Sequence, residues 1–247
     1  MQFKRIIPSL ALTSDGALAD ELRVLGKTRD PAEAAVAYAG AGADEIIFVA
    51  RATAVEALCE LAQRLAPALP IPLAFWTDLT AVAEVGELLG AGAARVAVQK
   101  AAIDDPDLIR ELAGEFGSEA IAVAVTAAGM DESWRVYDEP GGTAREWDAL
   151  TWAQVVEAQN GGAVIIESPG GGPHGEPYDF GLLRSVSEAV ARPVMAAGEA
   201  GSVEDLFDAL MIGGADAVLV SSLLHLGSAT VTEIKSFLSE HGLSVRY

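Results

Sequence analysis

The chain has 247 residues, a mass of 25.5 kDa, 51% hydrophobic residues and a formal net charge of −20. This length and an even composition predict one domain over residues 1–247, and the negative charge disfavours nucleic acid and anionic membranes as partners. No apolar run reaches the roughly 18 to 20 residues of a membrane span, and the first residues lack a signal-peptide pattern, which favours a cytoplasmic protein.

Short apolar runs alternate with segments rich in alanine and leucine along the whole chain. Continuous apolar runs of this length are typical of parallel strands that are covered on both faces. The segments 30–42 and 202–214 begin with Asp or Ser and end with Gly, as helices do. Eight such units predict an α/β fold, a (β/α)8 barrel. The predicted strands are IIPSLAL (6–12), EIIFVA (45–50), IPLAFW (71–76), RVAVQK (95–100), IAVAVTA (121–127), AVIIES (163–168), PVMAAG (193–198) and AVLVSS (217–222).

An internal repeat supports the barrel, because similar residues recur about half a chain apart. The offsets agree for three pairs: Gly42 and Gly162 (162 − 42 = 120), Gly92 and Gly214 (214 − 92 = 122), and Pro72 and Pro193 (193 − 72 = 121). A twofold-repeated half-barrel explains all three. The one long insertion, residues 129–150, alternates aromatic residues around a Pro-Gly-Gly sequence and predicts a small β-hairpin.

Cysteine and histidine are scarce. Cys59 is the only cysteine, so an internal disulfide is excluded, and we expect a buried thiol on a helix. The three histidines show no metal-ligand spacing, so neither a metal nor another cofactor is expected.

With the strands in place, the chain resembles the cyclase subunit of imidazole glycerol phosphate synthase, a barrel of histidine biosynthesis, over almost its whole length. The resemblance implies a twofold-symmetric barrel with its active site at the carboxyl ends of the strands. It rests on ordered similarity in KRIIPSL (4–10), GADEIIF (42–48), AAIDDPDLIRELAGEFGS (101–118), WRVY (134–137), LLRSVSEAV with RPVMAAGEAGS (182–202) and GADAVLVSSLLHLG (214–227).

The expected catalytic positions carry other residues. The resemblance implies two aspartates that act as acid and base, and these map to Ala11 and Thr126. Neither alanine nor threonine exchanges protons near neutral pH, so the chemistry of the family loses both proton carriers.

The phosphate-binding turns that the resemblance implies are also altered. Trp76, Thr77 and Asp78 replace a glycine-rich turn after strand three, and Gly198-Glu199 replaces paired glycines after strand seven. An indole and carboxylates oppose phosphate binding, whereas Ser221 and Ser222 after strand eight remain plausible donors.

The resemblance further implies a glutaminase-like partner and a ring of charges at the amino-terminal end of the barrel, past which ammonia enters. Arg5, Glu45 and Arg95 match three ring positions, and Ala163 occupies the fourth. Either ammonia channelling or simple mutual pairing of these charges explains the three that remain.

A different set of polar residues occupies the strand ends. Lys100, one of four lysines, could form a Schiff base or act as a general base, or it could merely pair with Glu167 or Asp78. Glu167 precedes the glycine-rich loop 168–177, which could be a mobile lid, bind an anion or only connect two elements. The predicted catalytic residues are Lys100, Glu167, Glu199 and Asp78, and the predicted substrate-binding residues are Arg51, Gln99, Thr126, Gly198, Ser221, Ser222 and His174.

Three hypotheses follow. The first is a lyase or cyclase that acts on a small polar metabolite bearing a carbonyl, with or without a phosphate group, in specialised metabolism. The second is a barrel without catalytic activity that supports a glutaminase-like amidotransferase. The third is the histidine-pathway cyclase reaction carried out with substitute residues.

Overall fold

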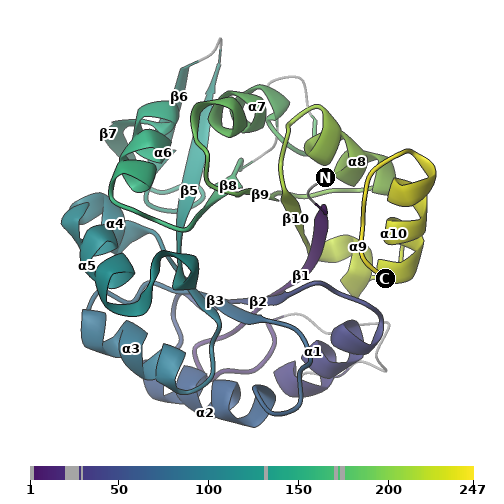
Figure 1. The fold of residues 1–247 in the computed structure, drawn as a ribbon, viewed down its shortest axis with the longest axis horizontal. Helices are drawn as coiled ribbons and strands as arrows, with labels where there is room; N and C mark the ends of the chain where they lie inside the picture. The colour runs from purple at the N-terminus through teal and green to yellow at the C-terminus, as the bar shows by residue number, and fades with distance from the viewer. Residues whose placement is uncertain (1–2, 20–27, 29, 131–132, 170–171, 173–175) are drawn as a thin grey trace. The chain divides into compact units, whose positions relative to one another are not determined.

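The computed structural model describes residues 3–19, 28, 30–130, 133–169, 172 and 176–247, in which strands alternate with helices (Figure 1). The chain divides into two compact units, Met1–Ala97 with Leu219–Tyr247, and Val98–Val218. The single domain over residues 1–247 stays a prediction.

The first unit is built on parallel strands that pair in chain order. β1 (Arg5–Ala11) pairs with β2 (Ile46–Val49), β2 with β3 (Leu73–Trp76), and β3 with β4 (Arg95–Val98). All four residues of β3 are buried, because helices cover the strands (Figure 1). These helices are α1 (Pro31–Gly40), α2 (Val55–Leu65) and α3 (Val82–Gly90), and the unit ends with α9 (Ser222–His225) and α10 (Val231–Glu240).

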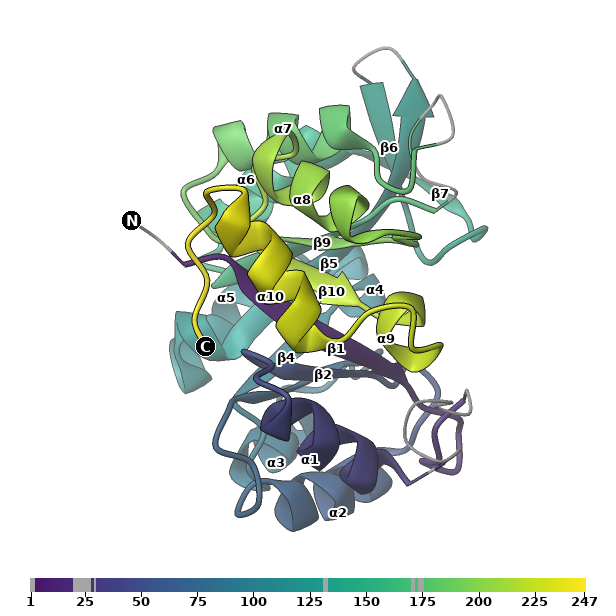
Figure 2. The same ribbon diagram turned by 90° about the vertical axis from the view of Figure 1, so that its right-hand side faces the viewer.

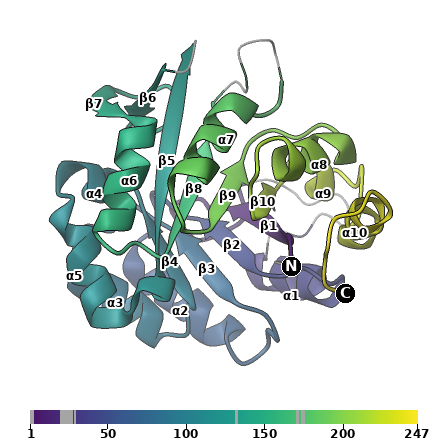
Figure 3. The ribbon, with the colours of Figure 1, turned by 45° about the horizontal axis from the view of Figure 1, so that its top comes forward.

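The second unit combines a parallel sheet with an antiparallel hairpin. β5 (Ile121–Met130) pairs in parallel with β8 (Ala163–Glu167), and β8 with β9 (Val194–Ala197). β5 also pairs antiparallel with β6 (Ser133–Tyr137), which pairs with β7 (Ala144–Asp148), so the predicted hairpin is confirmed (Figure 3). The helices are α4 (Lys100–Asp104), α5 (Asp107–Phe116), α6 (Ala149–Ala158), α7 (Phe180–Ala189) and α8 (Val203–Met211), with a 3-10 turn at Ser118–Ala120.

Eight strands separated by helices, the last being β10 (Ala217–Val220), give the fold class (β/α)8 barrel. The predicted helices 30–42 and 202–214 correspond to α1 and α8, which begin after the capping residues Asp30 and Ser202. The predicted strand 95–100 is two residues too long, because β4 ends at Val98 and Lys100 begins a helix.

The twofold repeat is visible in matching backbone geometry. The amide of Ile46 donates to the carbonyl of Pro72, and the amide of Val164 donates to that of Pro193, each at 3.0 Å. Gly92 and Gly214 both adopt a positive φ, +117° and +72°, a conformation that glycine reaches without steric cost. Matching local structure therefore recurs for two of the three predicted pairs, whereas Gly42 has a φ of +90° and Gly162 does not have a positive φ.

Candidate functional site

Three polar side chains of the second unit meet at the carboxyl ends of strands. Gln99 follows β4, Thr126 lies in β5, and Glu167 is the last residue of β8. Thr126 and Glu167 are register partners of two parallel strands, so their side chains leave the sheet on the same face. The structure thus brings three of the predicted site residues together.

A chain of hydrogen bonds joins these three side chains. The Gln99 amide nitrogen Nε2 donates to Thr126 Oγ1 at 2.8 Å, and Thr126 Oγ1 donates to Glu167 Oε2 at 2.6 Å. Gln99 Nε2 also lies 3.4 Å from the backbone carbonyl oxygen of Tyr137 in the hairpin. Sequence reasoning missed this contribution of Tyr137, because a backbone carbonyl has no sequence signature.

The contact with Tyr137 fixes the direction of the chain. A carbonyl oxygen only accepts, so the atom of Gln99 that faces it must be the NH2 group. The hydroxyl of Thr126, having accepted from that group, then directs its hydrogen to the carboxylate of Glu167. Gln99 Oε1 is consequently a fixed acceptor.

Burial makes it energetically unfavourable for the remaining acceptor of Gln99, Oε1, to lack a hydrogen bond. Gln99 is 1% exposed and Thr126 is fully buried, whereas Glu167 is half-buried. Within the described residues, Gln99 Oε1 is buried without a hydrogen-bond partner. Leaving a buried acceptor unsatisfied costs about 1 to 3 kcal/mol, which a hydrogen-bond donor at this place would recover.

The next strand end adds a second carboxylate. Ala197, in β9, is the register partner of Glu167, and Gly198 and the exposed Glu199 follow it. A Cβ atom at Gly198 would lie 2.6 Å from ring carbons of Tyr178, so only glycine fits here. Tyr178 is fully buried, and this burial, with the charge of Asp205, raises the pKa of its hydroxyl.

Lys100 lies outside this hydrogen-bonded chain. It begins α4, its side chain is 53% exposed, and its ammonium nitrogen lies 2.7 Å from Asp104 Oδ2. Asp104 also contacts Arg145, which in turn contacts Asp138. The hydrogen bond from Lys100, followed by that from Arg145, lowers the pKa of Asp104. Lys100 is therefore paired, but with an acid that the sequence did not point to.

Predicted site residues also occur in the first unit. The guanidinium carbon of Arg51 lies 4.5 Å from the ring centroid of Trp76, a cation–π contact at the ends of β2 and β3. Trp76 is 2% exposed, whereas Asp78, two residues further, is exposed. The indole thus occupies the interior at the position where the resemblance implies a glycine turn.

A small cavity of about 210 Å³ opens at the end of β1 in the first unit. Ala11 and Ser221 lie in its wall, whereas Ser222 is exposed at the start of α9 beside β1 (Figure 2). Ser221 and Gln99 occupy equivalent places in the repeat (221 − 99 = 122) and have similar backbone angles, ψ −86° and −84°. The side chains that line the cavity are those of Ser9, Leu10, Ala11, Leu18, Val49, Ser221 and His225.

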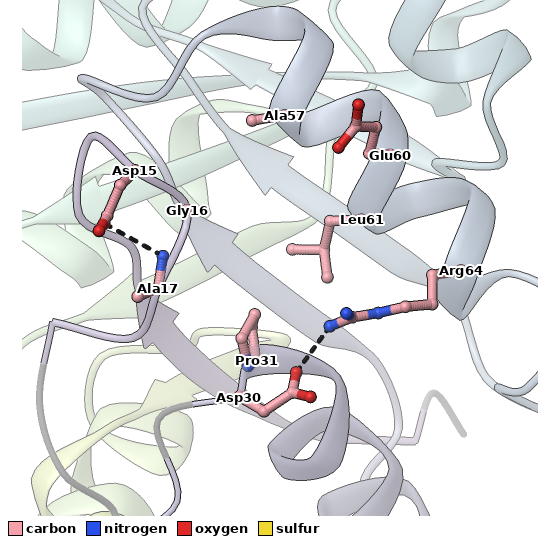
Figure 4. A pocket seen from close by; sticks show the side chains of 9 residues that line it. All are labelled: Asp15, Gly16, Ala17, Asp30, Pro31, Ala57, Glu60, Leu61 and Arg64. Carbon is pink, nitrogen blue, oxygen red and sulfur yellow. Dashed lines mark hydrogen bonds and ion pairs between the residues drawn. The ribbon is translucent and has the colours of Figure 1, made fainter.

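A larger hollow of about 470 Å³, also in the first unit, lies between α2 and the residues around Asp15 and Asp30 (Figure 4). Arg64 and Asp30 form an ion pair of 2.6 Å at its edge, and Glu60 adds a further carboxylate. A hydrogen bond from the hydroxyl of Thr13 lowers the pKa of Asp15. Sequence reasoning missed this hollow, because its residues come from separate segments without a motif.

The matched charges of the predicted ring pair with one another. Glu45 is 2% exposed and contacts Arg5 at 3.0 Å and Arg95 at 2.5 Å. The carboxylate is thus held between two guanidinium groups, an arrangement that stabilises a buried charge.

Other sequence expectations concern single residues and absences. His174 lies outside the described residues. Cys59 lies on α2 as predicted but is only half-buried, and burial, then Glu87 and Glu56, raises the pKa of its thiol. Across the described ranges, no group of three or more His, Cys, Asp or Glu side chains is placed to hold a metal ion. Nor does any helix in those ranges have the length and apolar character to cross a membrane.

Comparisons with known proteins give a consistent result. Residues 5–230 match the family model described as "Histidine biosynthesis protein". The imidazole glycerol phosphate synthase subunit HisF of Dehalococcoides mccartyi strain BAV1 is 37% identical to the chain over 98% of both proteins. The subunit of the same name from Myxococcus xanthus is 39% identical over 88% of this chain and 87% of its own.

Proposed function

Because the chain belongs to the histidine biosynthesis protein family of barrels, we propose that it is an enzyme in which Glu167 carries the proton. The reaction is of lyase or cyclase type, on a small polar metabolite with a carbonyl group, in specialised rather than histidine metabolism. The observation that carries this proposal is the 2.6 Å hydrogen bond from Thr126 to Glu167.

This bond matters because of what the resemblance implies at Thr126. An aspartate is expected there, and threonine cannot replace its chemistry. The neighbouring strand nevertheless supplies a carboxylate at the same height, because Glu167 is the register partner of Thr126. A proton carrier is therefore retained at this strand end, although another strand bears it.

Glu167 suits proton transfer better than Lys100 does. The carboxylate is half-buried and oriented by a buried hydroxyl, whereas the ammonium group of Lys100 is exposed and paired with Asp104. A general base must be held within hydrogen-bond reach of the proton that it removes, which favours the oriented group. The Schiff-base role considered for Lys100 is not part of this proposal.

Deuterium exchange tests the assignment directly. A panel of small amino ketones and keto acids is incubated with the protein in D2O, and exchange next to the carbonyl is followed by NMR. We expect the wild-type protein to catalyse the exchange, and Glu167→Gln to lower the exchange rate about 100-fold or more. Equal rates in the two proteins would contradict the role of Glu167. Borohydride treatment with the same compounds should give no adduct at Lys100, and an adduct together with no exchange would overturn the proposal.

The second candidate function is the imidazole glycerol phosphate synthase reaction itself, with a glutaminase-like partner. It is favoured by the 37% identity over 98% of the chain to a protein named as a subunit of that synthase, and by the paired charges around Glu45. Expression in a histidine auxotroph that lacks the cyclase subunit tests it. We expect no growth, and growth that depends on a glutaminase subunit would establish this second function instead.

A further inference from the structure

We infer that the site formed by Gln99, Thr126 and Glu167 binds its substrate through a protonated nitrogen group, an amidinium or an ammonium. This inference deepens the proposed function, on which it rests, because it gives the substrate class of the same site.

The first argument is the polarity of the hydrogen-bonded chain. Gln99 Nε2 is committed to Thr126 Oγ1 and to the carbonyl of Tyr137, and the hydrogen of the Thr126 hydroxyl is committed to Glu167. The N–H and O–H donors of Gln99 and Thr126 are thus used in hydrogen bonds within the protein. The polar atoms that this series of hydrogen bonds leaves for a ligand are therefore acceptors, not donors.

The second argument is the buried acceptor of Gln99. Its Oε1 is buried without a hydrogen-bond partner among the described residues, and the whole side chain is 1% exposed. The Tyr137 carbonyl prevents the amide from turning over to offer its NH2 group in that place. Because Oε1 has almost no exposed surface, neighbouring side chains must shift before a ligand reaches it. A ligand with N–H donors then satisfies this atom, whereas a carboxylate or phosphate oxygen would face it with like partial charge.

The third argument is charge. Glu167 contributes a carboxylate to the hydrogen-bonded series, and Glu199 follows the end of the next strand, β9. The net charge of −20 draws cations toward the protein and repels anions, so the general field and the local acceptors select the same kind of ligand.

Three small molecules of nearly equal shape test this inference. Acetamidinium carries a positive charge and two nitrogen donors, acetamide is neutral with one, and acetate is negative with none. Each is titrated into the full chain at constant ionic strength, and the side-chain NH2 signals of Gln99 are followed by NMR. We expect saturable shifts in the order acetamidinium, acetamide, acetate, with about a tenfold or greater difference in Kd between the first and the last. Equal affinities, or tighter binding of acetate, would overturn the inference.

Two variants and a matched control separate the site from the acidic surface. Glu167→Gln removes the charge but keeps an acceptor for Thr126, and it should weaken acetamidinium binding about tenfold or more. Glu115→Gln makes the same change at an exposed position of α5 and should leave the Kd unchanged. Should both variants bind as the original protein does, the cation is held by the general surface and the inference fails. Gln99→Leu, if it folds, should weaken binding of both acetamidinium and acetamide.

The binding order is independent of turnover. If Glu167→Gln exchanges deuterium as fast as the original protein, the proposed function fails while the preference for acetamidinium can stand. If the preference is absent while exchange depends on Glu167, only the inference about the substrate fails.

Discussion

Replacing Thr126 by valine should destabilise the protein far more than the loss of one hydroxyl from the surface would. Valine has the shape of threonine but neither donates nor accepts, so the change removes both bonds of the hydroxyl without leaving a cavity. Gln99 Nε2 then keeps only its 3.4 Å contact with the carbonyl of Tyr137, and Glu167 loses a donor at 2.6 Å.

The magnitude follows from the burial of the two partners. Gln99 is 1% exposed, so its amide cannot turn to water, and an unsatisfied buried group costs about 1 to 3 kcal/mol. Glu167 is half-buried and recovers part of its loss through solvent, which we place at about 1 kcal/mol. We therefore expect a decrease of about 2 to 4 kcal/mol in the free energy of unfolding. For a chain of this length that corresponds to a Tm lower by roughly 4 to 16 °C.

Urea unfolding followed by circular dichroism measures this difference. Thr126→Ser keeps the hydroxyl and is the control, with an expected loss below about 1.5 kcal/mol for one methyl group. The double variant Thr126→Val with Gln99→Leu should be more stable than the sum of the single changes predicts, because it removes both ends of the broken bond. If Thr126→Val lowered the free energy of unfolding by less than about 0.5 kcal/mol, the hydrogen bonds of Thr126 would not have the energetic role assigned to them.

Three further changes test other parts of the structure. Gly198→Ala places a Cβ atom 2.6 Å from the ring of Tyr178 and should lower the free energy of unfolding by about 1 to 3 kcal/mol in urea titrations. Lys235→Met leaves Asp44 without its 2.8 Å partner and should cost about 3 to 5 kcal/mol in the same assay, since the lysine is 2% exposed. Burial raises the pKa of Tyr38 from 10.0 to about 12, so its contribution to stability is complete below pH 10 and is lost between pH 10 and about 12. Tyr38→Phe should reduce the alkaline loss of stability in unfolding curves measured against pH, and the share that remains includes that of the buried Tyr178.

Matched controls make these outcomes decisive. Gly114→Ala places its Cβ atom in open space on α5 and should be neutral or stabilising. Lys100→Met removes an exposed i,i+4 pair and should cost about 0.5 kcal/mol or less. At neutral pH, Tyr38→Phe should be neutral or stabilising, because the Tyr38 hydroxyl is buried without a partner among the described residues. A marked loss in any of the three would show that local disruption, and not the stated contact, dominates.

Sequence patterns sufficed for the fold because the barrel repeats simple local rules. Apolar runs mark the strands, and glycine and proline mark their ends. Pro72 and Pro193, noted as equivalent positions of the repeat, both accept a backbone hydrogen bond from a neighbouring strand. The limit of this reasoning lies at the strand ends. The apolar run of β4 gave no sign that the chain turns at Gln99, and this turn starts α4 and places Lys100 beside Asp104.

The site was predictable as a set of residues but not as an arrangement. Gln99, Thr126 and Glu167 were all expected to bind substrate or to take part in catalysis. Their sequence spacing of 27 and 41 residues does not indicate which side chain donates and which accepts each hydrogen bond. Register between β5 and β8 sets the pairing of Thr126 with Glu167. The Tyr137 carbonyl, which sets the direction, is a backbone group.

The twofold repeat gives a way to separate what the backbone requires from what the chemistry requires. Gln99 and Ser221 share nearly the same ψ at equivalent places, yet Gln99 donates a buried hydrogen bond to Thr126 and Ser221 lines a small cavity. Trp76 and Ala197 likewise end equivalent strands, β3 and β9, with side chains of very different size. Backbone geometry therefore tolerates either residue, and the choice between them must come from packing or from a ligand. Exchanging Gln99 for serine keeps a backbone that the repeat already accommodates, so any loss of acetamidinium binding in that variant belongs to the side chain.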